Sequence, residues 1–100
     1  MLNGREILLG RNDGLSKTTG WRTWNAALVS IEYLKTLGDL SGKTVWDVSS
    51  GNGLLALCSE ILGASVVATE CGSCLPLLKS NIAKNSSKAR AVEHAWGQPL

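Results

Sequence analysis

The sequence lacks several features that would mark whole classes of protein. No apolar run approaches the roughly 18 residues that a membrane span requires, so we expect no membrane contact. Three cysteines, an odd number, do not indicate a disulfide framework. The first residues lack the basic and apolar segments of a secretory signal. A net charge of +2, with the basic residues scattered, gives no case for nucleic-acid binding. Together these absences favour a reducing setting, cytosolic or nuclear, of which we expect the cytoplasm.

What is present is the composition of an ordinary globular chain, with 44% hydrophobic and 18% charged residues. A length of 100 residues allows one domain and no more. We expect residues 1–20 to form a short strand and loop segment, and residues 21–100 to form the domain proper. Its first helix is expected to run to Leu37, with Thr23 as a plausible N-cap, because apolar residues repeat there with helical spacing.

The stretch from Thr44 to Glu70 organises the rest of the chain. Residues 44–48 are rich in β-branched and aromatic side chains, which predicts a strand buried on both faces. Residues 49–53 form a glycine-rich turn, and residues 54–62 place their apolar side chains on one helical face. Gly63 is the expected C-cap, and residues 65–69 are the next buried strand. The pattern is a βαβ unit, whose ligand site lies at the strand carboxyl ends.

The remaining sequence adds a helix from Leu75 to about Ile82 and a third strand within residues 89–95. The predicted fold class is therefore α/β: a partial Rossmann-like three-layer sandwich, with an N-terminal helix and a β-α-β-α-β half sheet. Right-handed crossovers place the strands side by side in the order 3-2-1. The first strand then has a free edge, which exposes it to self-association unless something covers it. The simpler interpretation is that the sequence is part of a longer protein.

Two features of the βαβ unit predict a ligand site. The turn can aim main-chain N–H groups at a polar ligand, although Leu54 stands where a G-x-G-x-x-G fingerprint needs its third glycine. Glu70 lies 19 residues beyond Gly51, close to the offset of the ribose-binding acid in nucleotide-binding units. The alternatives are a turn without a ligand and an ordinary loop glutamate. The combination of turn and acid favours a site.

Other residues are more ambiguous. Asp47, inside an apolar strand, needs a partner if it is buried. It can support the turn, bind a ligand's amino group, or equally point toward solvent at the end of the sheet. Trp24 and Trp96 flank the turn in sequence and can wall a ligand or pack in the core. Cys71 and Cys74 have the spacing of a redox or metal pair, but a zinc site needs further ligands and small residues are common in turns. We therefore assign no metal ligands.

Five motifs occur in one order along residues 18–100. Together they resemble the family-16 protein methyltransferases, which use S-adenosylmethionine and mostly modify lysines of other proteins. Within that family the sequence is most similar to the branch that acts on translation elongation factor 2. The motifs are Thr19–Ala27, Val45–Leu55, Ala68–Glu70, Leu77–Ile82 and Ala95–Gln98.

The resemblance implies a class I methyltransferase sheet and a set of cofactor contacts. Trp24 would flank S-adenosylmethionine from the first helix, and Trp96 would lie near its adenine. Glu70 would bind the ribose hydroxyls. The turn would lie against the methionine part through Ser49, Ser50 and Gly51, with Gly53 opening the next helix.

The sequence departs from the family pattern in two places. Ser49 stands where the turn usually begins with glycine, which costs of order 1 kcal/mol if that position needs a positive φ. The chain also stops at Leu100, before the family's Asp-x-x-Tyr-type motif. We therefore expect a truncated enzyme that carries the cofactor half and has little or no activity alone. The alternatives are an inactive binding module and, more weakly, a fragment of a nicotinamide-dependent oxidoreductase.

Overall fold

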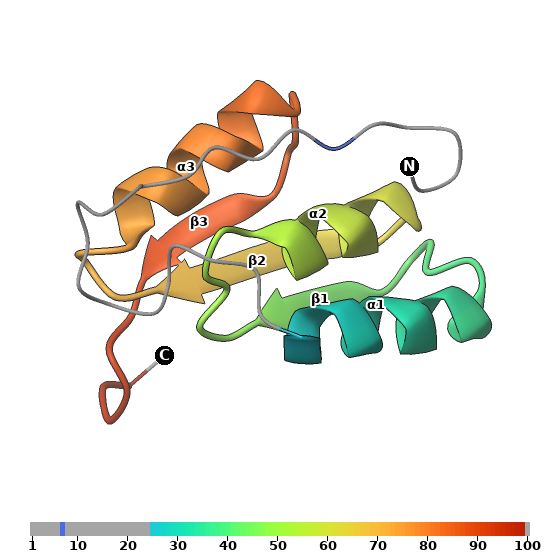
Figure 1. Cartoon of the computed structure of the whole chain (residues 1–100), viewed down its shortest axis with the longest axis horizontal. Helices are drawn as coiled ribbons and strands as arrows, with labels where there is room; N and C mark the ends of the chain where they lie inside the picture. The colour runs from blue at the N-terminus through green and yellow to red at the C-terminus, as the bar shows by residue number, and fades with distance from the viewer. Residues whose placement is uncertain (1–6, 8–24, 100) are drawn as a thin grey trace.

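The computed structural model describes residue 7 and residues 25–99. The expected N-terminal segment, Thr23 and Trp24 lie outside the described residues. Six elements follow one another along the described chain (Figure 1). They are α1 (Asn25–Leu37), β1 (Thr44–Asp47), α2 (Leu54–Ile61), β2 (Ser65–Glu70), α3 (Leu75–Lys84) and β3 (Arg90–Glu93).

Glycines lie at both ends of α2, but the C-cap is Leu62, one residue before the Gly63 that the sequence predicts. Gly53 precedes the helix with φ +90°, and Gly63 follows the C-cap Leu62 with φ +111°. Both values lie in the region that L side chains rarely adopt. A Cβ at Gly63 would also come within 2.7 Å of the Ser41 hydroxyl, so the chain needs glycine there to return to the sheet.

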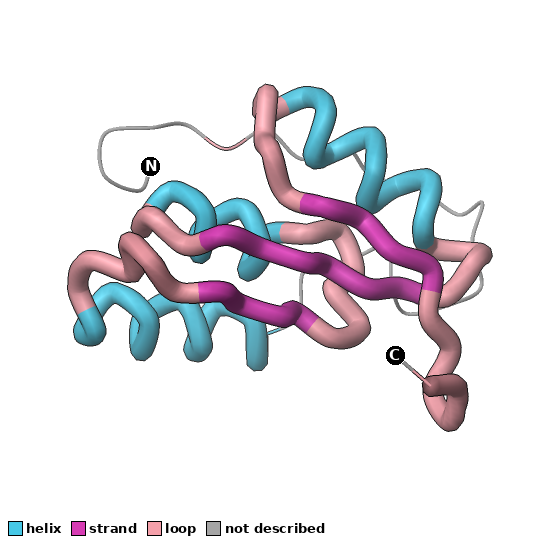
Figure 2. Tube along the Cα trace, turned by 180° about the vertical axis from the view of Figure 1, so that it is seen from behind, coloured by secondary structure: helices cyan, strands magenta, loops and turns pink. Residues whose placement is uncertain are grey.

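The three strands form one parallel sheet in the order β1-β2-β3, which confirms the predicted arrangement. Both crossovers run in the same direction across the sheet, so α2 and α3 lie on the same face. α1 packs beside α2 (Figure 1). Figure 2 shows the opposite face, where no helix crosses in front of the strands in the described part of the chain. The partial Rossmann-like α/β architecture is thus confirmed.

The expectation that the first strand is buried on both faces is wrong. In β1 the side chains alternate between exposed and half-buried, and Trp46 remains 52% exposed. β2 is the strand that is buried almost throughout. The physical reason is position: β1 pairs only with β2 among the described residues, whereas β2 has a neighbour on each side. An apolar strand composition does not distinguish an edge strand from a central one.

The core lies between the helices and the sheet. Leu78 of α3, Ala56 of α2 and Ala68 of β2 are completely buried within it, and Ile31 of α1 joins them. No described helix is long and apolar enough to cross a membrane. The buried Leu78 of α3 lies next to Gly53, in the turn that follows β1. The candidate site is built at that end of the sheet.

Candidate functional site

The turn between β1 and α2, residues 49–53, is fastened to the end of β2 by hydrogen bonds. The backbone N–H of Ser50 donates to the carbonyl oxygen of Thr69 over 2.8 Å, and the N–H of Ser49 donates to the Thr69 hydroxyl over 3.2 Å. A further bond, from the Gly53 N–H to the Ser50 oxygen over 3.0 Å, closes the turn on itself. The turn is thus held in one conformation by its neighbour strand.

Glu70 is the acid that the sequence places at the end of this strand, and the residue is buried, with 7% of its surface exposed. One oxygen accepts the N–H of Gly51 over 2.7 Å, and the other accepts the N–H of Cys71 over 2.8 Å. An ionised carboxylate has about four acceptor sites, so roughly two stay open for a ligand's hydroxyl groups. Glu70 therefore connects the glycine turn to the start of the next turn through its carboxylate.

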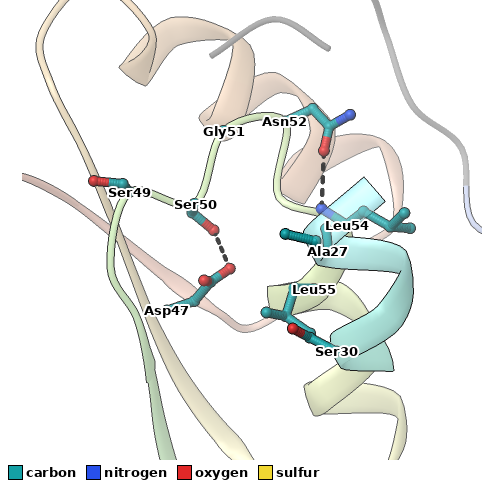
Figure 3. Close-up of a pocket in the computed structure, with 10 residues that line it drawn as sticks. Ala27, Ser30, Asp47, Ser49, Ser50, Gly51, Asn52, Leu54 and Leu55 are labelled. Atoms are coloured by element: carbon teal, nitrogen blue, oxygen red, sulfur yellow. Dashed lines mark hydrogen bonds between the residues drawn. The ribbon is translucent and has the colours of Figure 1, made fainter. Parts of the chain in front are cut away.

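Two asparagines complete the support, and sequence reasoning assigned a role to neither. Asn81, completely buried on α3, donates from its side-chain amide to the backbone oxygen of Asn52 over 2.8 Å. The Asn52 side chain in turn accepts the N–H of Leu54, at the start of α2, over 3.1 Å (Figure 3). The available signal was the polar Asn81 beside the apolar residues Leu78 and Ile82 on one helix.

A cavity of about 290 Å³ lies between α1 and the turn (Figure 3). Neither Glu70 nor Trp96 lines it. Most of its lining residues have small or polar side chains, and four of them belong to the turn. The lining residues are Ala26, Ala27, Ser30, Asp47, Ser49, Ser50, Gly51, Asn52, Leu54 and Leu55.

Asp47 is half-buried at the base of this cavity, where its carboxylate accepts a 2.5 Å hydrogen bond from the Ser50 hydroxyl. Burial raises the pKa of Asp47 above its usual value, and the negative charge of Glu70 adds to the rise. Hydrogen bonds from the Ser50 hydroxyl and the Ala56 backbone oppose this shift without cancelling it. The sequence expectation that a buried Asp47 needs a partner is met by Ser50.

The raised pKa of Asp47 makes stability depend on pH. Between the unfolded value of 3.8 and the higher folded value, the folded chain binds more protons, so stability falls as pH rises through that window. We expect Asp47→Asn, which keeps an acceptor for Ser50, to be more stable than the parent at pH 7 and equal to it below pH 3.8. Urea unfolding at both pH values measures the difference. A parent chain that gains stability relative to Asp47→Asn between pH 4 and pH 7 would contradict the sign.

Ser49 has a φ of +57°, so the first turn position does require the conformation that glycine adopts most easily. Its hydroxyl accepts a 2.5 Å hydrogen bond from the indole N–H of Trp96. Trp96 follows β3 and is 80% exposed. An indole that is tied at its nitrogen and exposed over most of its surface offers a ring face to a ligand.

A pair of substitutions separates backbone strain from the bond to Trp96. Ser49→Gly and Ser49→Ala both remove the hydroxyl, but only glycine accepts φ +57° without strain. We expect the glycine variant to be the more stable of the two by about 1 kcal/mol, since a left-handed backbone costs an L residue roughly that amount. Thermal or urea unfolding measures it. An alanine variant at least as stable as the glycine variant would show that the turn relaxes around residue 49.

The structure brings together six of the seven residues that the sequence singles out for a cofactor. Ser49, Ser50, Gly51 and Gly53 form the turn, and Glu70 and Trp96 hydrogen-bond to it. Trp24 lies outside the described residues. Their roles toward a cofactor stay predictions, and their convergence at the carboxyl end of a parallel sheet matches the general location of ligand sites in such folds.

Comparison with known sequences gives the family. The family model described as lysine methyltransferase matches residues 4–100. A protein-lysine N-methyltransferase from Chaetomium thermophilum, EFM3, is 38% identical over 93 residues, which are 85% of this chain and 28% of that protein. Mouse METTL21A, a protein N-lysine methyltransferase, is 35% identical over 83 residues, 77% of this chain and 38% of its own. Mouse EEF1A lysine methyltransferase 3 is 26% identical over 98 residues, 94% and 42% of the two chains.

Comparison with solved structures supports the fold. A candidate RNA methyltransferase from Pyrococcus horikoshii superposes with a TM-score of 0.64 at 24% identity, over 85% of this chain and 44% of that one. The present chain spans less than half the length of each of these relatives. Since the family model covers nearly the whole sequence, the chain belongs to the lysine methyltransferase family.

Proposed function

We propose that this chain is the S-adenosylmethionine-binding half of a cytoplasmic protein-lysine methyltransferase. The observation that carries the proposal is the 2.7 Å hydrogen bond from the Gly51 N–H to the Glu70 carboxylate. It joins the glycine turn to the acid 19 residues later, which are the two parts of a nucleoside-binding βαβ unit. Family membership supplies the reaction class.

The residues present fit such a cofactor. Glu70 has acceptor capacity left for two ribose hydroxyls, and Trp96 offers an exposed ring face for an adenine. On the other side of the turn, the cavity beside α1 has room for the amino-acid part. Asp47 and Ser50 supply oxygens there that suit an ammonium group. The turn would thus lie against the methionine part of the ligand, as the family resemblance implies.

S-adenosylmethionine supplies a methyl group on a positively charged sulfur, which a neutral lysine amine attacks in line. An enzyme for this reaction mainly positions the reactants and removes water from the amine. The residues assigned here hold the cofactor, and none of the described ones is assigned to the lysine. We therefore expect little or no transfer by the chain alone, and turnover on an elongation factor by pure material would contradict this.

The substrate class is proposed from the relatives. Those relatives are named as protein-lysine methyltransferases, and one is named for EEF1A. The sequence motifs are most similar to the branch that acts on elongation factor 2. We propose a translation elongation factor as the protein substrate, with elongation factor 2 as the first to test with a full-length relative.

Calorimetric titration of the purified chain with S-adenosylhomocysteine tests the proposal. Saturable binding with one site per chain, and weaker binding of NAD, is the expected result. A folded chain that binds no S-adenosylhomocysteine would leave the family as ancestry only. Tighter binding of NAD would instead support the oxidoreductase alternative that the incomplete G-x-G-x-x-G pattern disfavours.

A second candidate, a non-catalytic interaction module, is favoured by the edge of β1. This strand pairs only with β2 among the described residues, and Trp46 beside its open edge is 52% exposed. We expect concentration-dependent self-association in sedimentation velocity, reduced by Trp46→Lys. Val29→Lys on α1 is the control, because Val29 is also apolar and 70% exposed but belongs to a helix and not to the β1 strand. A monomer at all concentrations would contradict edge pairing.

A further inference from the structure

Two cysteines occupy the turn that leads from β2 into α3, at the carboxyl end of the sheet (Figure 1). Cys71 follows Glu70 directly, and Cys74 is the N-cap residue of α3. Spacing alone favours neither a redox nor a metal role for such a pair. The structure adds information that the spacing does not contain, namely the distance between the sulfurs and their position beside the acid of the candidate site.

The backbone geometry of this turn suits a disulfide. The N–H of Cys74 donates to the carbonyl oxygen of Cys71 over 3.1 Å, which is the hydrogen bond of a β-turn. The Cα atoms at the ends of a β-turn lie within about 7 Å, and disulfides usually span Cα separations of about 4.4–6.8 Å. The backbone can therefore keep its hydrogen bond while the two side chains are joined.

The side chains already converge. The Cys71 sulfur lies 3.4 Å and the Cys74 sulfur 3.9 Å from the same Ser73 hydroxyl. Both sulfurs and a Glu70 carboxylate oxygen lie within 4.8 Å of one another. Rotation of the side chains closes the gap to the roughly 2 Å of a sulfur–sulfur bond.

The two thiols differ in access. Cys71 is half-buried, so a reagent can reach it, whereas Cys74 is only 5% exposed. This difference in access favours a first reaction between the oxidant and Cys71. Cys74, in the same turn, then attacks the mixed disulfide formed on Cys71. The third cysteine, Cys58 on α2, is 3% exposed in the core, and burial raises the pKa of its thiol. It serves as an internal control because both effects make it unreactive.

We propose that Cys71 and Cys74 form a reversible disulfide, a modification site at the rim of the Glu70 site, with glutathione disulfide as the oxidant. The Cys71 thiolate attacks one sulfur of glutathione disulfide, forming a mixed disulfide and releasing one glutathione thiolate. The Cys74 thiolate then attacks the Cys71 sulfur, closing the intramolecular bond and releasing the second glutathione. The two thiol protons end on the two glutathiones. Two electrons pass from the cysteine pair to the oxidant.

The site has a connection to ligand binding, which rests on the proposed function. The Cys71 N–H donates to the same carboxylate that the proposal assigns to the ribose. Closing the Cys71–Cys74 ring constrains the backbone at Cys71 and thereby the position of the Glu70 oxygen. Because the Cys71 side chain must rotate to form the bond, the proposal includes a shift of the adjoining Cys71 N–H relative to the Glu70 carboxylate, and this shift weakens cofactor binding.

A metal ion would be the other use of three converging ligand atoms. The disulfide is favoured because the cluster among the described residues holds only three ligand atoms, whereas structural zinc usually takes four. Zinc binding is therefore an outcome of the test. One zinc ion bound per reduced chain, lost in Cys74→Ser and protecting the thiols from oxidation, would overturn the disulfide.

The experiment incubates the full, reduced chain with glutathione disulfide, then alkylates the remaining thiols and identifies them by mass spectrometry. We expect two of the three cysteines to escape alkylation as one Cys71–Cys74 bond, to recover with dithiothreitol, and to behave alike in Cys58→Ala. Cys74→Ser should stop at a glutathione adduct on Cys71. Three alkylated thiols, or a glutathione adduct that persists on Cys71 in the parent, would overturn the proposal.

Titration with S-adenosylhomocysteine measures the coupling separately. The oxidised chain should bind at least about fivefold more weakly than the reduced chain, the lower limit of common coupling between sites, and dithiothreitol should restore the affinity. Equal affinities would overturn the coupling. Failure of the reduced chain to bind would instead refute the proposed function and the coupling with it, while the alkylation result still decides the disulfide.

Discussion

Glu70→Ala is expected to abolish measurable binding of S-adenosylhomocysteine. The variant removes the acceptor proposed for both ribose hydroxyls. Hydrogen bonds to a charged group contribute about 1.5–3 kcal/mol each, so losing two weakens binding by about 3 kcal/mol or more, a factor above 100. The same change leaves the N–H groups of Gly51 and Cys71 without their acceptor, which loosens the turn as well. Calorimetry on the parent and the variant gives the ratio of affinities.

The control must distinguish loss of the contact between Glu70 and the ligand from unfolding of the variant. Glu93→Ala removes an equal charge from the residue that pairs with Glu70 in register on β3, but this side chain is exposed. It should keep the parent affinity. Circular dichroism shows whether Glu70→Ala still folds, and Glu70→Gln retains the side-chain volume if it does not. A folded alanine variant that binds like the parent would remove Glu70 from the proposed site.

Gly53→Ala is expected to give the largest loss of stability of any single change discussed. Gly53 has a φ of +90°, and an added Cβ would lie 2.8 Å from the Cδ1 atom of Leu78. Leu78 is completely buried, so it has little space to move. Left-handed strain of about 1–2 kcal/mol and overpacking of about 1–3 kcal/mol together predict a loss of about 3 kcal/mol. This is a large share of the roughly 5–15 kcal/mol that holds a typical domain folded.

Gly42→Ala is the matched control for the Gly53 substitution. Gly42 has a similar φ of +81°, but no atom lies within 4 Å of an added Cβ. It should cost only the backbone strain, about 1 kcal/mol. Urea unfolding of both variants therefore isolates the contribution of the contact with Leu78. Equal losses in the two variants would show that α3 does not pack tightly against the turn.

The elements of the fold follow mostly from local sequence. Apolar side chains at helical spacing predict α2 and α3, and β-branched runs predict β1 and β2 to within about two residues at each end. The parallel order of the strands follows from the handedness of βαβ crossovers. The burial of the side chains could be predicted less well from local sequence. The composition of residues 44–48 suggests a central strand, yet β1 is an edge strand with Trp46 exposed, because burial depends on neighbours that the local pattern does not specify.

In the candidate site too, some features follow from the sequence and others only from the tertiary structure. The sequence by itself determined the glycine turn and the acid of Glu70 at the expected offset, since both depend on residue type and spacing within one βαβ unit. Only the tertiary structure decided that Glu70 binds the Gly51 N–H, that Asn81 of α3 holds the turn, and that the sulfurs of Cys71 and Cys74 lie beside that carboxylate. These contacts depend on how helices and strands pack across long sequence separations, and no periodicity along the chain encodes such distances.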